Sequence, residues 1–148
     1  MANRYGLQIR AATHTDAAGL SELLATSGVT ATGEAVGARL EALHRSGAGT
    51  ALIAVEWGPP SGLIVVNWVR TLRADASIAH VDMLFVAPDD RRRGIARLLL
   101  KAAAQSARSA GCDELVIAVR EASLHAFCEA NGFERSGQAY ARALRKKS

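Results

Sequence analysis

The segment Met83 to Leu100 places the tightest limits on the fold of this chain. It reads MLFVAPDDRRRGIARLLL, an apolar run followed by Pro88, a charged stretch and a helical pattern that opens at Gly94. Pro88 has no N–H group to give to a ladder, so the strand must end there. From Gly94 to Gly111, apolar residues recur at helical spacing with charged residues between them, which predicts an amphipathic helix. A strand that leads into such a helix predicts an α/β (α+β) architecture.

The remaining sequence predicts further strands and helices. The run Gly-Pro-Pro-Ser-Gly at 58–62 is tolerated only in a turn. The β-rich runs on both sides of it are therefore expected to pair as an antiparallel hairpin. The next strand along the chain extends this hairpin to a three-stranded meander. The short apolar run near residue 117 is typical of a strand that is buried on both faces. Strands are predicted at 6–12, 50–57, 63–72, 77–86, 114–120 and 138–144, and helices at 15–27, 33–45, 94–110 and 123–130.

Length, composition and charge exclude several classes of protein. The chain has 148 residues, 49% of them hydrophobic and 22% charged, which indicates a single folded domain over residues 1–148. The net charge is +4, and three of those charges belong to the tail Arg145, Lys146 and Lys147. The one dense internal basic cluster, residues 91–93, directly follows Asp89 and Asp90, so a nucleic-acid partner is not expected.

The cysteines and the apolar runs argue against a metal site and a membrane segment. Cys112 and Cys128 are the only cysteines, and neither stands in a zinc-ligand spacing, so no metal is expected. No stretch approaches the ~18 apolar residues of a membrane span, and no signal peptide is recognisable. The expectation is a cytoplasmic protein with reduced thiols and no membrane contact.

The start of the predicted helix at Gly94 has the properties of an anion-binding site. The first N–H groups of a helix have no partner within it, and the helix dipole adds partial positive charge. Gly94 and Ala96 leave room for a phosphate near the backbone, and neighbouring arginines add charge. The sequence contains neither Gly-x-x-x-x-Gly-Lys-Ser/Thr nor Gly-x-Gly-x-x-Gly, which disfavours ATP, GTP and dinucleotides as ligands.

The same segment resembles the pyrophosphate-binding motif of the GNAT family of N-acetyltransferases, Val-x-Pro-x-x-Arg/Gln-x-x-Gly-x-Gly/Ala after the fourth strand. Three further features match the family in order: the opening at 9–13 with Asp16 after it, the hairpin, and a closing Phe-Cys-Glu-Ala-Asn-Gly-Phe at 127–133. The resemblance therefore covers nearly the whole chain. The residues that fit the motif are Val86, Pro88, Arg91, Gly94 and Ala96.

The resemblance implies a fold and a cofactor. The fold is a mixed, mainly antiparallel sheet of six to seven strands flanked by about four helices, in which strands four and five run parallel and splay apart around acetyl-CoA. The pyrophosphate is expected on the N–H groups of 92–96, and the pantetheine arm on the main chain of strand four. The expected acetyl-CoA-binding residues are Leu84, Phe85, Val86, Arg91, Arg92, Arg93, Gly94, Ile95 and Ala96.

The implied reaction is direct attack of a neutral amine on the thioester in a ternary complex. A main-chain N–H near Leu84 is expected to hold the oxyanion. The amine requires a base, and the candidates are Asp82, His80 and Glu56, each of which can equally be a solvent-facing polar residue. Strict strand alternation places His80, Asp82 and Leu84 on one face, so that the first two can act together.

A cysteine stands where the family commonly has a tyrosine. That tyrosine can protonate the departing thiolate, and here its place is taken by Cys128. Cys128 is either a proton donor or an inert small core residue, and Tyr140 is a weaker donor candidate. The substitution affects the expected acid step and leaves the expected cofactor unchanged.

The acceptor is expected to be a primary amine of a small molecule. Glu34 and Glu56 are the expected substrate-binding residues, because carboxylates attract ammonium groups. A protein or peptide acceptor remains open, and so does a non-catalytic acetyl-CoA-binding module. A homodimer through the edge of the last strand is a further expectation.

Overall fold

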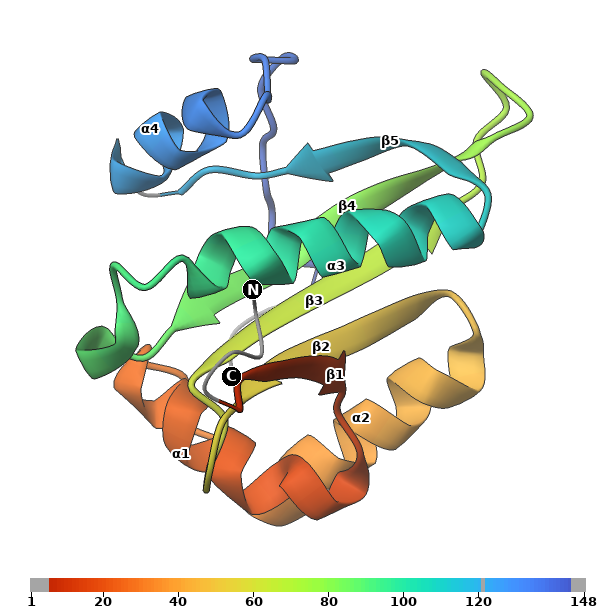
Figure 1. Ribbon diagram of the computed structural model, residues 1–148. Coiled ribbons are helices and arrows are strands. Elements are labelled where there is room, and N and C mark those ends of the chain that lie inside the picture. The colour runs from red at the N-terminus through yellow and green to blue at the C-terminus, as the bar shows by residue number, and fades with distance from the viewer. Residues whose placement is uncertain (1–5, 121, 145–148) are drawn as a thin grey trace. The chain divides into compact units, whose positions relative to one another are not determined.

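The computed structural model describes residues 6–120 and 122–144 (Figure 1). It divides into two compact units, Met1–Ile117 and Ala118–Ser148. The first unit contains the sheet with three of the helices, and the second contains the fourth helix. The single domain over residues 1–148 stays a prediction.

The first unit is built on a mixed five-stranded sheet with the strand order β1-β2-β3-β4-β5. The first four strands pair antiparallel with their neighbours, and the fifth pairs parallel to the fourth. The predicted hairpin, the meander and the parallel pairing after a crossover helix are confirmed. The strands are β1 (Gln8–Ala11), β2 (Gly49–Val55), β3 (Gly62–Val69), β4 (Ser77–Val86) and β5 (Cys112–Ile117).

Three helices of this unit lie close to their predicted positions. They are α1 (Ala17–Thr26), preceded by a short 3₁₀ turn at His14–Asp16, α2 (Gly33–Ser46) and α3 (Ile95–Ser109). At the start of α2, the Thr32 hydroxyl accepts a hydrogen bond from the Ala35 N–H at 3.1 Å. The same helix ends at Gly47, whose φ of +66° is the left-handed conformation that a glycine adopts without strain.

The two faces of the sheet are covered by different helices. Side chains of α1 and α2 form one core with alternate residues of β2 and β3, whereas α3 lies on the opposite face. A Cβ atom at Gly62 would lie 2.9 Å from a methyl group of Leu99 and 3.1 Å from one of Ile95, so α3 packs directly on the backbone of β3. The buried cluster under α1 and α2 contains Ala17, Leu20, Leu23, Leu24, Val36, Ala51, Ile53 and Leu63.

The expected number of strands is wrong for the described residues. The sheet has five strands and not six to seven, and residues 138–144 form no strand. A strand needs a hydrogen-bonding neighbour and a buried face. Here the large apolar side chains of the segment remain exposed, at 94% for Tyr140 and 90% for Leu144. The homodimer through this last strand therefore loses its structural basis and stays untested.

The expectation for the fifth strand is also only partly correct. β5 pairs with β4 as predicted, but it stands last in the strand order of the described residues and is not buried on both faces. Its apolar side chains, Leu115 to Ile117, are half-buried, and Asp113 and Glu114 are exposed. An apolar run of this length does not distinguish an inner strand from an edge strand with one covered side.

The second unit contains α4 (Ala122–Ala130), which confirms the predicted helix. The Asn131 side chain donates a hydrogen bond to the Phe127 carbonyl at 2.7 Å, and Gly132 follows with a φ of +86°. These residues end the helix, as the Asn-Gly pair predicts.

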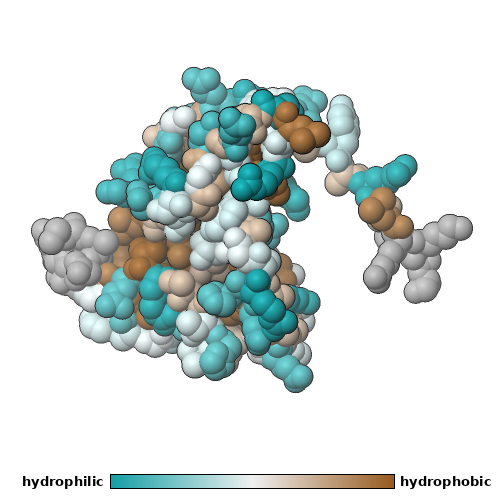
Figure 2. All heavy atoms as spheres, turned by 90° about the vertical axis from the view of Figure 1, so that its right-hand side faces the viewer, coloured by the Kyte–Doolittle hydropathy of each residue, from teal (hydrophilic) through white to brown (hydrophobic). Residues whose placement is uncertain are grey.

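Apolar side chains on the surface are scattered over separate segments. On the face seen in Figure 2, hydrophilic and intermediate residues predominate and hydrophobic ones gather only in small patches. Among residues 6–120 and 122–144, no helix has the length and apolar character needed to cross a membrane. The large exposed hydrophobic residues are Val29, Trp57, Val69, Leu72, Tyr140 and Leu144.

Candidate functional site

Among residues 6–120 and 122–144, the carboxyl-terminal half of β4 has a strand neighbour on one side only. β5 pairs with β4 from Ser77 to Val81 and stops at Ile117, whereas β4 continues to Val86 beside β3. Within the described residues, the β5-facing edge of 82–86 therefore has no ladder partner. Main-chain N–H and C=O groups left open in this way are a template for an added strand or an extended ligand.

A β-bulge marks the point where β4 loses its second neighbour. Val66 of β3 lies opposite Val81, and the preceding residue of β3, Val65, lies opposite Met83. Asp82 is the extra residue of β4 and has no partner in this register. A bulge leaves one residue out of the ladder and bends the strand, and bulges are frequent beside active sites.

The bulge reverses the predicted alternation of side chains. His80 lies opposite Asn67 of β3, and Leu84 lies opposite Ile64. Asn67 and Ile64 are three positions apart in a regular strand, so their side chains face opposite sides of the sheet. Their partners His80 and Leu84 therefore face opposite sides as well. The prediction that His80 and Leu84 share one face is therefore wrong, because it assumed an uninterrupted strand. His80 lies on the face of α1 and α2, and Leu84 on that of α3.

The loop between β4 and α3 has the backbone of an anion-binding site. After a 3₁₀ turn at Pro88–Asp90, Arg92 has a φ of +66° and Gly94 a φ of +77°. Arg92 is the non-glycine residue with positive φ in the described chain, a conformation that costs about 1–3 kcal/mol and occurs preferentially at ligand sites. Residues of positive φ that alternate with residues of negative φ can turn neighbouring N–H groups toward one side, as in an anion-binding nest.

Several N–H groups at the end of this loop have no acceptor in the described part of the chain. Among the hydrogen bonds of the described residues, none has the main-chain N–H of Arg92, Gly94 or Ala96 as its donor. The space beyond Gly94 is also open, since a Cβ atom there would have no heavy atom within 4 Å. The start of α3 thus has the open backbone that the prediction requires, and binding of an anion there stays a prediction. We call residues 92–96 the cradle.

Arg91 turns back on β4 instead of facing the cradle. Its Nε donates to the Val86 carbonyl at 3.1 Å, and its guanidinium lies 5.5 Å from the centre of the Phe85 ring. These contacts tie the loop to the end of the strand. The expected role of Arg91 as a ligand of the pyrophosphate stays a prediction, because the guanidinium keeps its charge and other N–H donors.

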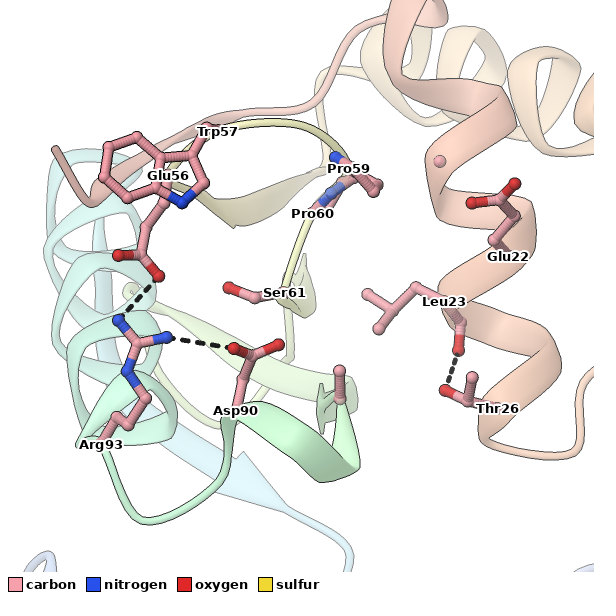
Figure 3. A pocket seen from close by; sticks show the side chains of 12 residues that line it. Glu22, Leu23, Thr26, Glu56, Trp57, Pro59, Pro60, Ser61, Asp90 and Arg93 are labelled. Carbon is pink, nitrogen blue, oxygen red and sulfur yellow. Dashed lines mark hydrogen bonds and ion pairs between the residues drawn. The ribbon is translucent and has the colours of Figure 1, made fainter.

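Arg93 is bound by two carboxylates. Its Nη2 lies 2.7 Å from Oε1 of Glu56, and its Nη1 donates to Oδ1 of Asp90 at 3.0 Å (Figure 3). The hydrogen bond to Glu56, together with the charges of both carboxylates, raises the pKa of Arg93 above its ordinary value. Glu56, expected as a base or a substrate ligand, is thus engaged with Arg93.

A pocket of about 490 Å³ adjoins this ion pair (Figure 3). The carboxyl-terminal part of α1 forms one wall, with Glu22, Leu23 and Thr26. The β2–β3 turn and the loop before α3 form the others. The remaining lining residues are Gly19, Glu56, Trp57, Pro59, Pro60, Ser61, Ala87, Asp90 and Arg93.

The other predicted site residues belong to three different elements. His80 and Asp82 are exposed on β4, and Glu34 is exposed in the first turn of α2. Cys128 is buried on α4 in the second unit, where burial, with a contribution from Glu129, raises the pKa of its thiol. Groups of three or more His, Cys, Asp or Glu residues that could hold a metal ion are absent from the described chain.

Several residues of this region were not expected from the sequence. For Asp90 the sequence does hold a signal, because its spacing of three residues from Arg93 suits an ion pair. Ser61 is buried in the β2–β3 turn and its carbonyl accepts the Ala87 N–H at 2.8 Å, a contact between distant segments that no local pattern shows. Nothing in the sequence around Trp57 indicates that this residue lines the pocket.

The family to which the chain belongs is decided by a comparison that covers most of its length. The model of the acetyltransferase (GNAT) family matches residues 20–133. The chain belongs to the GNAT family. The expectation of an acyltransferase is confirmed, and acetyl-CoA is the acetyl donor that enzymes of this family use. A search of curated proteins finds no match.

Solved structures of GNAT enzymes have the same fold. An acetyltransferase from Trypanosoma brucei is 22% identical with a TM-score of 0.79, over 93% of this chain and 99% of that one. Glucosamine-6-phosphate N-acetyltransferase from Arabidopsis thaliana is 18% identical with a TM-score of 0.84, over 94% and 99%. The aminoglycoside N-acetyltransferase AAC(6')-Iy, in complex with CoA, is 20% identical with a TM-score of 0.81, over 95% of each chain.

Proposed function

We propose that this chain is an N-acetyltransferase that transfers the acetyl group of acetyl-CoA to a primary amine of a small molecule. The observation that carries the proposal is the unpaired edge of 82–86, which leads directly into the cradle. A strand edge suits the amide groups of a pantetheine arm, and converging N–H groups suit a pyrophosphate. Acetyl-CoA carries both parts in that order.

The cradle supplies the expected phosphate contacts. The N–H groups of 92–96 lie at the amino terminus of α3, where the helix dipole favours a negative charge. The positive φ of Gly94 and the open space beside it let a phosphate approach the backbone. On β4, the main chain of 84–86 holds the arm beside the sheet, and its thioester then lies near the bulge.

The bulge supports the placement of the reaction. A main-chain N–H near Leu84, on the edge that β5 does not cover, donates to the carbonyl oxygen as the amine attacks and the oxygen gains negative charge. Asp82 accepts a proton from the attacking amine, directly or through water, since a lysine-like ammonium with a pKa of about 10 must lose a proton first. We assign the base to Asp82 because it is the bulge residue at the start of the open edge, whereas His80 lies in the part of β4 that also pairs with β5.

The leaving group needs little help from Cys128. The raised pKa of its thiol keeps Cys128 protonated near neutral pH, so the group can donate but is a weaker acid than an ordinary thiol. The departing thiolate belongs to a thiol with a reference pKa of about 8.5 and is stable enough to leave unassisted. Cys128 is therefore assigned no required step.

Support for a small amine as acceptor comes from the structural neighbours. Among them are enzymes named for glucosamine-6-phosphate and for aminoglycosides, all of which carry amines on sugar rings or their derivatives. On this chain, Glu34 and Glu22 are exposed carboxylates of α2 and α1 that can attract an ammonium group.

Calorimetric titration with acetyl-CoA tests the proposal. We expect micromolar binding of acetyl-CoA and of dephospho-CoA, which keeps the pyrophosphate and the arm, and much weaker binding of ATP, which has no arm. The double variant Gly94→Glu/Ala96→Glu places two carboxylates at the cradle and should abolish binding. A wild type that does not bind acetyl-CoA contradicts the proposal.

The acceptor is identified by thiol release with a panel of amines. Turnover of sugar amines or polyamines supports the small-molecule assignment. Turnover of peptides alone would favour a protein acceptor, and tight acetyl-CoA binding without turnover of either class would favour a non-catalytic binding module.

A further inference from the structure

Glu56 connects the end of β2 to the loop that carries the cradle. It follows β2 directly, and its carboxylate lies 2.7 Å from the guanidinium of Arg93, two residues before α3 begins. In Figure 3 the pair spans the space between the β2–β3 turn and the loop, and Asp90 approaches Arg93 from the other side. The Glu56 side chain is 13% exposed and that of Arg93 is 42% exposed, so the contact is shielded from water mainly on the Glu56 side.

The first part of the loop has its own main-chain anchors. Ala87 donates to Ser61 at 2.8 Å, Asp90 donates to Ala87 at 2.9 Å, and the Arg91 side chain holds the Val86 carbonyl. Residues 92–94 have fewer anchors in the described chain. The Arg93 side chain contacts Glu56 and Asp90, and the Gly94 carbonyl accepts a hydrogen bond from the Leu98 N–H of α3.

We propose that Glu56 is a positioning residue for acetyl-CoA: by holding Arg93, it keeps the cradle in the strained conformation that presents its N–H groups to the pyrophosphate. This inference rests on the function proposed above. The left-handed backbone of Arg92 is unfavourable by itself and persists only where its surroundings hold it. The ion pair beside Arg92 supplies that constraint.

The assignment changes the expected role of Arg93. Both of its terminal nitrogens contact a carboxylate, Glu56 or Asp90, so we assign to Arg93 a role in holding the loop in place of the expected contact with the phosphates. One guanidinium faces two carboxylates, so the cluster carries a net charge of −1 from its three side chains. Positive charge for the ligand then comes from Arg91 and Arg92.

A purely electrostatic role and a positioning role of Glu56 predict opposite effects of Glu56→Gln on acetyl-CoA binding. If Glu56 acted only through its charge, removing a carboxylate near an anion site would strengthen acetyl-CoA binding. If Glu56 positions the cradle, the same variant weakens binding, because Arg93 loses a strong partner and the backbone relaxes. The sign of the change distinguishes the two.

The experiment compares Glu56→Gln with the matched variant Glu41→Gln. Glu41 pairs with Arg45 at the same 2.7 Å, but on α2 and with both side chains well exposed, at 65% and 74%. We expect Glu56→Gln to raise the Kd of acetyl-CoA about threefold to tenfold, as the loss of one constraining pair allows, and Glu41→Gln to leave it unchanged. Binding of S-acetyl-pantetheine, which lacks the pyrophosphate, should change in neither variant.

Kinetics with a working amine separate positioning from catalysis. Glu56→Gln should raise the KM for acetyl-CoA and leave kcat at saturating acetyl-CoA within about twofold, since the reacting groups are untouched. A fall in kcat with an unchanged KM would mean that Glu56 is the base and would overturn the inference. So would unchanged or tighter acetyl-CoA binding, or an equal loss of S-acetyl-pantetheine binding.

A double-mutant cycle with Arg93→Met tests whether Glu56 acts through Arg93. In the Arg93→Met background, Glu56→Gln should have no further effect, whereas additive losses would overturn the inference. Arg93→Lys, which keeps the charge, should recover part of the affinity that Arg93→Met loses. A wild type that fails to bind acetyl-CoA overturns the proposed function and this inference together, whereas a binding wild type with an unaffected Glu56→Gln overturns this inference alone.

Discussion

The two halves of β4 have the same strand neighbour on one side and differ on the other. From Ser77 to Val81 the strand lies between β3 and β5, and Ala79 and Val81 are buried. From Asp82 to Val86, β3 is its one partner in the described part of the chain, and most of its side chains are half-buried or exposed. The bulge at Asp82 separates the doubly paired half from the open half.

The difference teaches how one strand can serve both the core and a ligand. A fully paired strand offers no main-chain group to a substrate, whereas a strand open along its whole length would lose ladder bonds and invite aggregation. Here the open part is short and follows directly on a well-packed part. We therefore expect substitutions in the doubly paired half to affect stability most, and those in the open half to affect binding and turnover.

The same substitution in both halves should have the largest contrasting effects. Val81→Asp places a carboxylate in the core without a partner and should lower the free energy of unfolding by about 3–5 kcal/mol. Leu84→Asp, at a half-buried position, should lower it by about 1–2 kcal/mol. Urea unfolding followed by circular dichroism measures both. Equal losses would show that the open half is as important for stability as the paired half.

Substitution of the bulge residue Asp82 should reduce turnover without changing the affinity for acetyl-CoA. Asp82→Asn removes the proposed base and should reduce kcat about a hundredfold, while the Kd of acetyl-CoA changes less than about twofold. Asp75→Asn, in the exposed β3–β4 turn, is the control and should leave both unchanged. Wild-type turnover in Asp82→Asn would remove Asp82 from the mechanism and make His80 the remaining candidate on β4.

An ion pair at the other edge of the sheet should affect stability alone. The hydrogen bond from Arg10 lowers the pKa of Asp16 from 3.8 to about 2, with smaller help from Thr13. The carboxylate thus stabilises the fold above about pH 4, and this contribution is lost as the pH falls through the folded-state pKa. Asp16→Asn should cost about 1–2 kcal/mol at pH 7, allowing for the exposure of Arg10.

Urea unfolding at several pH values measures this difference. It should shrink between about pH 4 and about pH 2, where the wild-type carboxylate takes up its proton. Arg10→Met should give a similar loss at pH 7, and the double variant should lose no more than either single variant. A difference that persists at low pH would mean that Asp16 acts through helix capping instead of charge.

The smallest expected effect is on the reactivity of a thiol at the start of the paired half. Cys112 lies opposite Ser77, and burial, with a contribution from Asp113, raises the pKa of its thiol. In a Cys128→Ser background, iodoacetamide at pH 8 should modify Cys112 about tenfold more slowly than a free thiol, with the rate rising toward higher pH. Urea should abolish the protection; a native rate equal to that of the free thiol would indicate that β4–β5 pairing opens readily.

Local patterns predict the elements of the first unit well. The strand 77–86 has the bounds that its composition and Pro88 predict, and α3 ends close to Gly111 as expected. These features depend on residues near one another in sequence, such as a proline without an N–H or a glycine with positive φ. The motif at the start of α3 was recognisable for the same reason, because its residues are contiguous in the sequence.

Features that depend on distant residues were not predictable. The bulge at Asp82 has no composition of its own, and strict alternation misplaced His80 as a result. The partners of Glu56 depend on how the β2–β3 turn meets the loop before α3, which no spacing along the chain records. At 138–144 the local pattern predicts a strand that does not form. An alternating pattern without a neighbouring strand makes no ladder.

The close approach of α3 to Gly62 has a consequence for protein engineering. The phosphate-binding motif lies within residues 86–96, yet the height of its helix above the sheet is set by a residue of β3 that precedes it by more than twenty positions. A larger residue at position 62 would lift the amino terminus of α3 and misalign the cradle, although the motif itself would read unchanged. Transplanting this motif into another scaffold therefore requires the glycine of the neighbouring strand as well.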